Sequence, residues 1–106
     1  MPKFLVEAKY NSDGLQGVRK EGAEARIRAI STLAGELGGS MESFYFAFGD
    51  VDAYVTVDLP DDETAAALAL AVEASGMVTM TTTKLLTGAQ VDQALAKTVP
   101  YRAPGT

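Results

Sequence analysis

The sequence contains no cysteine and no histidine. The chain therefore has no disulfide, no thiolate nucleophile, no imidazole base and none of the soft ligands that usually hold zinc or haem iron. Any chemistry has to rely on carboxylates, tyrosine, lysine, arginine, hydroxyl groups and the backbone. We expect no cofactor and no metal site.

Long hydrophobic runs and an excess of basic residues are also missing. No apolar stretch reaches the roughly 20 residues that span a bilayer, and the N-terminus lacks the pattern of a secretory signal. Nine basic residues stand against fourteen acidic ones, a net charge of −5, whereas binding to phosphate backbones depends on lysine and arginine. We expect no nucleic-acid partner, no membrane partner and a cytoplasmic location.

The composition is that of one small folded domain. The chain has 106 residues, of which 47% are hydrophobic and 22% charged. Residues 1–98 are predicted to form the domain, and residues 99–106, which include two prolines, an extended tail. A domain of this size buries a modest share of its surface, so association between copies would supplement its core.

The segment from Ser43 to Asp58 predicts a β-hairpin. Side chains alternate across a strand, which puts three rings on one face of the first strand: Phe44, Phe46 and Phe48. The second strand has an aliphatic face: Val51, Ala53, Val55 and Val57. Gly49 and Asp50 lie between the two runs and predict a tight type II′ turn.

The remaining segments alternate between strand and helix periodicity. They predict strands over 3–10 and 77–86, helices over about 15–37 and 61–76, and a short helix after Thr87. Gly17 and Gly22 weaken the start of the first helix, so its regular part is expected near Ala23, with Ser12 or Asp13 as a cap. The order β-α-β-β-α-β predicts an α+β, ferredoxin-like fold with a four-stranded antiparallel sheet, helices on one face and an extra C-terminal helix.

Helices on one face leave the other face of the sheet open. We expect that face to carry aromatic rings together with polar side chains, drawn from Glu42, Asp52, Tyr54, Thr56, Thr79 and Thr81. A sheet this apolar would be a contact surface, because large exposed apolar patches usually are. We therefore expect two copies to meet sheet to sheet, with the chain as its own partner.

The segment Phe48-Gly49-Asp50-Val51-Asp52, preceded by Gly38-Gly39, resembles the signature of the GYD domain proteins, small bacterial proteins placed near the dimeric α/β barrels. Their pattern is Phe-Gly-x-Tyr-Asp, and Val51 stands here in place of the tyrosine. We interpret Val51 as a smaller filler for a ring that only packs. Other matching pieces make the resemblance cover nearly the whole chain: Tyr10 with Gly14, Pro60-Asp61-Asp62, and residues 83–87. The resemblance implies a ferredoxin-like fold and a homodimer, but no reaction.

Six side chains are candidates for a ligand-binding site, and no catalytic residue is assigned. Asp50 and Asp52 flank the predicted turn and could act as a carboxylate pair, although turn aspartates more often bond to nearby backbone. Three phenols are expected on neighbouring strands and could orient a carbonyl or only fill the rim of a core: Tyr10, Tyr45 and Tyr54.

Lys84 is the sixth candidate. Its strand position predicts an inward side chain that needs an acidic partner: Glu7, Asp52 or Asp58. Three further cations could bind an anion, but lie off the buried stripe of the first helix and are expected on a solvated face: Lys20, Arg26 and Arg28.

Two functions are consistent with this pattern. The leading hypothesis is a homodimeric α/β-barrel protein that binds a small organic molecule between sheet and helices, with any catalysis independent of cofactors. It rests on fold analogy. The alternative is a non-catalytic interaction or regulatory module that assembles through its sheet. A cavity of a few hundred Å³ lined by polar groups would favour the first, and a dry core would favour the second.

Overall fold

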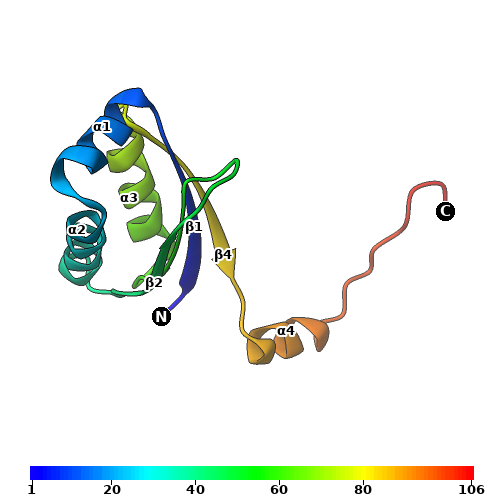
Figure 1. Cartoon of the computed structure of the whole chain (residues 1–106). Helices are drawn as coiled ribbons and strands as arrows, with labels where there is room; N and C mark the ends of the chain where they lie inside the picture. Colours follow the sequence, from blue (N-terminus) through cyan, green and yellow to red (C-terminus); the bar gives the residue numbers. More distant parts are fainter.

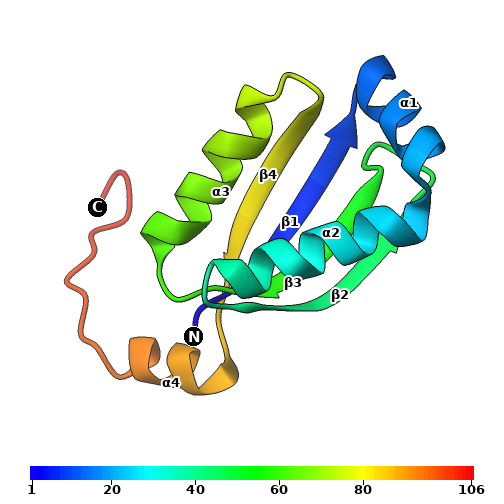
Figure 2. The ribbon, with the colours of Figure 1, turned by 90° about the vertical axis from the view of Figure 1, so that its left-hand side faces the viewer.

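The computed structural model describes all 106 residues. Its elements follow the chain as β1 (Lys3–Tyr10), α1 (Ser12–Glu21), α2 (Ala23–Glu36), β2 (Ser40–Phe46), β3 (Ala53–Asp58), α3 (Asp62–Ala74), β4 (Val78–Leu85) and α4 (Gly88–Leu95). The strands form one antiparallel sheet in the order β2-β3-β1-β4. Helices α1, α2 and α3 lie on one face of it (Figures 1 and 2). The predicted α+β, ferredoxin-like arrangement is confirmed.

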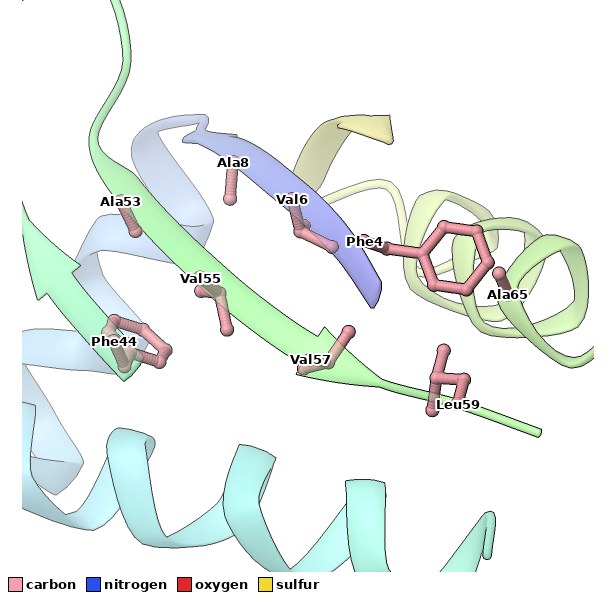
Figure 3. Close-up of a cluster of buried hydrophobic side chains, with 9 residues drawn as sticks. All are labelled: Phe4, Val6, Ala8, Phe44, Ala53, Val55, Val57, Leu59 and Ala65. Carbon is pink, nitrogen blue, oxygen red and sulfur yellow. The ribbon is translucent and has the colours of Figure 1, made fainter. Parts of the chain in front are cut away.

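The core lies between this helix layer and the two central strands. Alternate residues of β1 and β3 point inward, and three residues from β2, α3 and the segment between β3 and α3 close the cluster: Phe4, Val6, Ala8, Ala53, Val55, Val57, Phe44, Leu59 and Ala65 (Figure 3). Three of the nine are alanines. Only 11 of 106 residues are buried in the single chain, so the core is thin.

The hairpin forms with a longer connection than the sequence predicted. β2 ends at Phe46 and β3 begins at Ala53, so residues 47–52 form the loop. Gly49 has no positive φ, which a type II′ turn requires at its first central position, so that turn was predicted wrongly. Phe48 is fully exposed rather than aligned with Phe44 and Phe46. The physical reason is Asp52, whose backbone N–H donates to the carbonyl of Ala8 at 2.9 Å and ties the loop to β1.

β2 contains a β-bulge. Met41 pairs with Val57 and Ser43 pairs with Thr56, so Glu42 is an extra residue on the β2 side. The Lys3 ammonium donates to the Glu42 carboxylate and, at 3.0 Å, to the Asp58 carboxylate. These two hydrogen bonds, to Glu42 first and then to Asp58, raise the pKa of Lys3. One cation therefore links β1, β2 and β3.

The first helical segment is two helices. Gly22 has φ +95° and separates α1 from α2, because a left-handed residue cannot continue a right-handed helix. The Asn11 side chain, rather than Ser12 or Asp13, caps α1 by accepting from the Gly14 N–H at 2.9 Å. The start of α2 at Ala23 agrees with the sequence, and α1 corresponds to the first, weakened part of the helix predicted over residues 15–37, although it begins earlier, at Ser12.

The later helices have the predicted caps. The Asp61 carboxylate accepts from the Thr64 hydroxyl at 2.6 Å and from its N–H at 2.8 Å, and these bonds lower the pKa of Asp61. Thr87 and Gln90 form the capping box of α4.

The open face of the sheet is mixed rather than apolar. Phe44 lies in the core on the helix side with Val55 and Ala53 (Figure 3), and the register places Phe46 on the same side. By the register, the outward positions are largely polar or charged: Lys3, Glu7, Lys9, Ser43, Thr56, Asp58, Thr79, Thr81 and Thr83. The prediction that this face is strongly apolar was therefore wrong. The prediction that four of its residues face outward was correct: Tyr54, Thr56, Thr79 and Thr81. The larger apolar and aromatic members of this face are Leu5, Tyr45, Tyr54 and Leu85.

The fold can be tested where the backbone at Gly39 passes close to the backbone at Asp58. A Cβ atom on Gly39 would collide with the carbonyl oxygen of Asp58, which neither backbone segment can avoid without moving. Gly39→Ala is expected to lower the free energy of unfolding by about 1–3 kcal/mol. Gly35→Ala is the matched control, because a Cβ there meets nothing within 4 Å. It should raise stability by about 0.5–1 kcal/mol as an alanine inside a helix. Equal urea-denaturation midpoints for the two variants would contradict the crossing.

Candidate functional site

The helix layer contains an open groove, which we call the helix groove. It lies between α1, α2 and α3, above the ends of β1 and β4, and its volume is about 510 Å³. This volume is within the range typical of small-molecule sites. Its lining is mainly apolar: Tyr10, Gly14, Gly17, Val18, Glu21, Arg26, Ala29, Ile30, Leu33, Leu68, Ala71, Val72, Ser75, Met77 and Val78.

A smaller slot of about 50 Å³ lies between the helices and the sheet. It shares seven lining residues with the helix groove and adds side chains of the core, among them Val6, Phe44 and Val55. Thirteen of its fourteen lining residues are hydrophobic. The exception is Arg26, which lines both spaces.

Arg26 is a cation placed in apolar surroundings. Its Nε atom is buried and has no hydrogen-bond partner, and no carboxylate forms an ion pair with its side chain. A buried polar group without a partner costs free energy, and most such groups in proteins are satisfied. A group that could accept from Arg26 would therefore be stabilised in the helix groove.

The sequence reading placed Arg26 on a solvated face, and this was wrong. The usable signal was the spacing to Ile30 and Leu33, four and seven residues later, which puts all three on one side of α2. The structure has Ile30 and Leu33 lining the groove beside Arg26.

Asp52 has a structural position. Its carboxylate accepts from the backbone N–H of Tyr10 at 2.8 Å. Its own carbonyl accepts from the Ala47 N–H at 2.9 Å, which closes the hairpin loop. Asp50 lies exposed in the same loop, two residues before it. The two aspartates are not a carboxylate pair in the groove.

The three tyrosines are divided between the two faces of the sheet. Tyr10 ends β1 and lines the helix groove. Tyr45 and Tyr54 pair directly across β2 and β3 on the open face, where Tyr45 is 71% exposed. The phenols therefore do not converge on one site.

Lys84 lies on the helix side of β4, as its strand position predicted, but its partner is different. Its ammonium contacts the Asp62 carboxylate at 2.9 Å, at the start of α3. None of the three expected acids is its partner, because Glu7 and Asp58 are on the open face and Asp52 is at the other end of the sheet. Lys84 is remote from the helix groove.

Of the six candidates, only Tyr10 lines the helix groove, with Arg26 and Glu21 as the charged residues. This arrangement can hold an anionic group beside a phenol and an apolar surface. No three His, Cys, Asp or Glu side chains lie close enough together to hold a metal ion. None of the helices combines the length and apolar character needed to cross a bilayer.

Comparison with known proteins gives one match. The family model described as GYD domain matches residues 4–95, which is 92 of the 106 residues. The match covers the four strands except Lys3, together with the helix groove and α4. Comparisons with curated proteins and with solved structures give no match.

The position of Asp52 leads to a test of its role. Asp52→Ala leaves the Tyr10 N–H without its acceptor, so the free energy of unfolding should fall by about 1–3 kcal/mol. Asp50→Ala, two residues away and exposed, should change it by less than about 0.5 kcal/mol. Chemical denaturation of both variants measures this. If the two aspartates proved equally dispensable, the carboxylate would not be what fixes the loop.

Proposed function

We propose, starting from the fact that this chain belongs to the GYD domain family, that it is a homodimer that binds a small organic acid in the helix groove. The ligand has one anionic group, which meets Arg26, and an apolar part, which fits the groove and the slot beneath it. The observation that carries this proposal is the unpartnered Nε of Arg26 in an otherwise apolar lining.

A carboxylate is the chemistry that suits Arg26 best. The guanidinium is planar, permanently charged and able to donate two parallel hydrogen bonds to a carboxylate. In apolar surroundings such a pair is stronger than in water, provided that both partners are satisfied. Tyr10 supplies a phenol in the same lining, and a hydroxyl can donate to the same anion.

The proposed function is ligand binding, without a chemical reaction. Cofactor-independent catalysis needs a proton donor or acceptor within hydrogen-bond reach of the ligand. Asp52 is bonded to backbone and Lys84 to Asp62, which leaves Glu21 as the one carboxylate lining the groove. A reaction in this groove would depend on Tyr10 and Glu21.

Two observations support the homodimer. The single chain buries only 11 residues, few for a folded domain of this length. The open face has no helix over it and carries the exposed rings of Tyr45 and Tyr54 side by side. A second copy on that face would cover both rings, and tyrosine is enriched at protein interfaces.

The alternative function is a non-catalytic interaction or regulatory module. It is favoured by Asp52, which is bonded to backbone, and by tyrosines that do not converge. In this case the groove would have no ligand of its own. Titration with small acids separates the two functions, because only the first requires Arg26.

The ligand proposal can be tested with matched acids and amides. Phenylacetate and hexanoate should raise the melting temperature, because a ligand that binds only the folded state stabilises it. Phenylacetamide and hexanamide have the same apolar parts without the charge and should have little effect. Arg26→Met should abolish the response to the acids, whereas Arg28→Met, on the exposed side of α2, should keep it.

The free energy of unfolding gives a second readout for the same variants. Arg26→Met removes an unpartnered buried group, so without ligand this variant should be at least as stable as the native chain. An acid response that persists in Arg26→Met, or that is equal for acids and amides, would contradict the proposed role of Arg26.

The homodimer is tested by light scattering coupled to gel filtration. The native chain should elute with twice its 11.1 kDa mass at micromolar concentration. Changing Tyr45 and Tyr54 together to serine removes two rings from the open face and should weaken the dimer by at least tenfold. Leu70→Ser is the control, because Leu70 is 70% exposed on α3. A native chain that stays at 11.1 kDa would refute the dimer.

A further inference from the structure

The C-terminal part of the chain, residues 86–106, leaves the end of β4 and runs away from the rest of the molecule. We call it the C-terminal arm; it contains α4 and the extended residues that follow. It projects on the side of the sheet opposite α1, α2 and α3 (Figure 1). It contributes to the elongated shape, with extents of 57 × 33 × 23 Å. The arm therefore points toward the side that a second copy on the open face would occupy.

Helix α4 lacks the packing that a helix of its length needs. It has eight residues and none of them is buried. Isolated helices shorter than about 12–15 residues are marginal in water, so helices of this length are normally held by packing of an apolar face. The capping box fixes where α4 begins, but no surface of its own chain buries α4. The surface that would pack against α4 therefore has to come from another molecule.

The arm has apolar residues where such a surface would touch it. Val91 and Leu95 are four residues apart and share one side of α4. Leu86 and Val91 hold the two positions of a hydrophobic staple, just before the cap and four residues into the helix. Beyond α4, Val99 and Tyr101 are about three-quarters exposed, as is Leu95 at 76%. Five larger apolar side chains in 21 residues are thus left uncovered or partly covered.

Charge indicates what covers them. The arm has two basic residues and one acidic residue, Lys97, Arg102 and Asp92, a side-chain charge of +1. Of the total of −5, the remaining 85 residues therefore carry −6. A cationic, apolar arm is complementary to the acidic body of this same protein, and opposite charges favour association.

We propose that the C-terminal arm is exchanged between two copies, so that each arm packs on the body of its partner. This rests on the proposed homodimer formed through the open face. Packed sheets are about 10 Å apart. The helix α4 is about 12 Å long, and eleven further residues can extend about 35 Å. The arm is thus long enough to cross to the partner and continue along it.

The first test removes one apolar side chain of the arm in the full-length protein. Leu95→Ser should raise the dissociation constant of the dimer by about tenfold or more, because Leu95 would lose its cover on the partner. Leu70→Ser, an equally exposed leucine on α3, should leave the constant unchanged. Analytical ultracentrifugation measures both, and circular dichroism checks that the domain of each variant is folded.

The second test shows which copy the arm touches. Since the chain has no cysteine, Thr98→Cys in the arm can carry a single nitroxide label. Copies that carry the nitroxide are prepared with nitrogen-14 and are mixed with nitrogen-15 copies that carry no nitroxide. Amide signals of the nitrogen-15 body should broaden if the arm of another copy packs on it, because only the other copies carry the nitroxide. A reduced nitroxide in the same mixture is the control.

The outcomes separate this inference from the dimer on which it rests. If the native chain is a monomer at all concentrations, the dimer and the exchange are both wrong. If it is a dimer that Leu95→Ser does not weaken, with no broadening between copies, the dimer stands and the exchange is wrong. If a nitrogen-15 copy that itself carries the nitroxide shows broadening while the mixed sample shows none, the arm folds back on its own body, and the exchange is again wrong.

Discussion

Phe4, Val6 and Val57 are buried on the helix side of the sheet, and the burial of such side chains is what holds the helix layer against the two central strands. Because the pleat is regular, the same two strands necessarily send their other residues to the opposite face. The helix layer is thus held by one side of the sheet only. Small side chains such as Ala8 and Ala53 are among the core residues, which keeps the core thin.

Much of this arrangement could be predicted from the sequence because it depends on local rules. Alternation separated the two faces of β1 and β3, although it did not decide which face of β3 points inward, and capping chemistry predicted Asp61 and Thr87 as helix starts. The hairpin loop could not be predicted, because it is fixed by hydrogen bonds between Asp52 and a strand more than 40 residues earlier. Gly22 was a weak signal for a different reason: a glycine can adopt either sign of φ, and only its φ decides between one continuous helix and two.

The candidate site shows a similar division. Tyr10 could be named as one of three phenols expected on neighbouring strands, but Arg26 was assigned to solvent because it lies off the buried stripe of its helix. Helical periodicity gives the centre of the buried stripe of a helix, but it does not decide whether residues at the edge of that stripe are buried or exposed. Arg26 lies at such an edge, beside a groove that exists only because α2 and α3 are spaced apart. Position relative to another helix is tertiary information, which this sequence does not encode locally.

The two outer strands, β2 and β4, each carry a feature that hinders the addition of another strand to the sheet edge. An exposed strand edge offers free N–H and C=O groups that can recruit further chains. On β2, the bulge at Glu42 interrupts that row and increases the local twist. On β4, the carboxylate of Glu73 takes up the N–H of Met80 at 3.1 Å. Pairing with further strands is thus discouraged at both margins of the sheet, which directs any contact between copies to a face rather than to an edge.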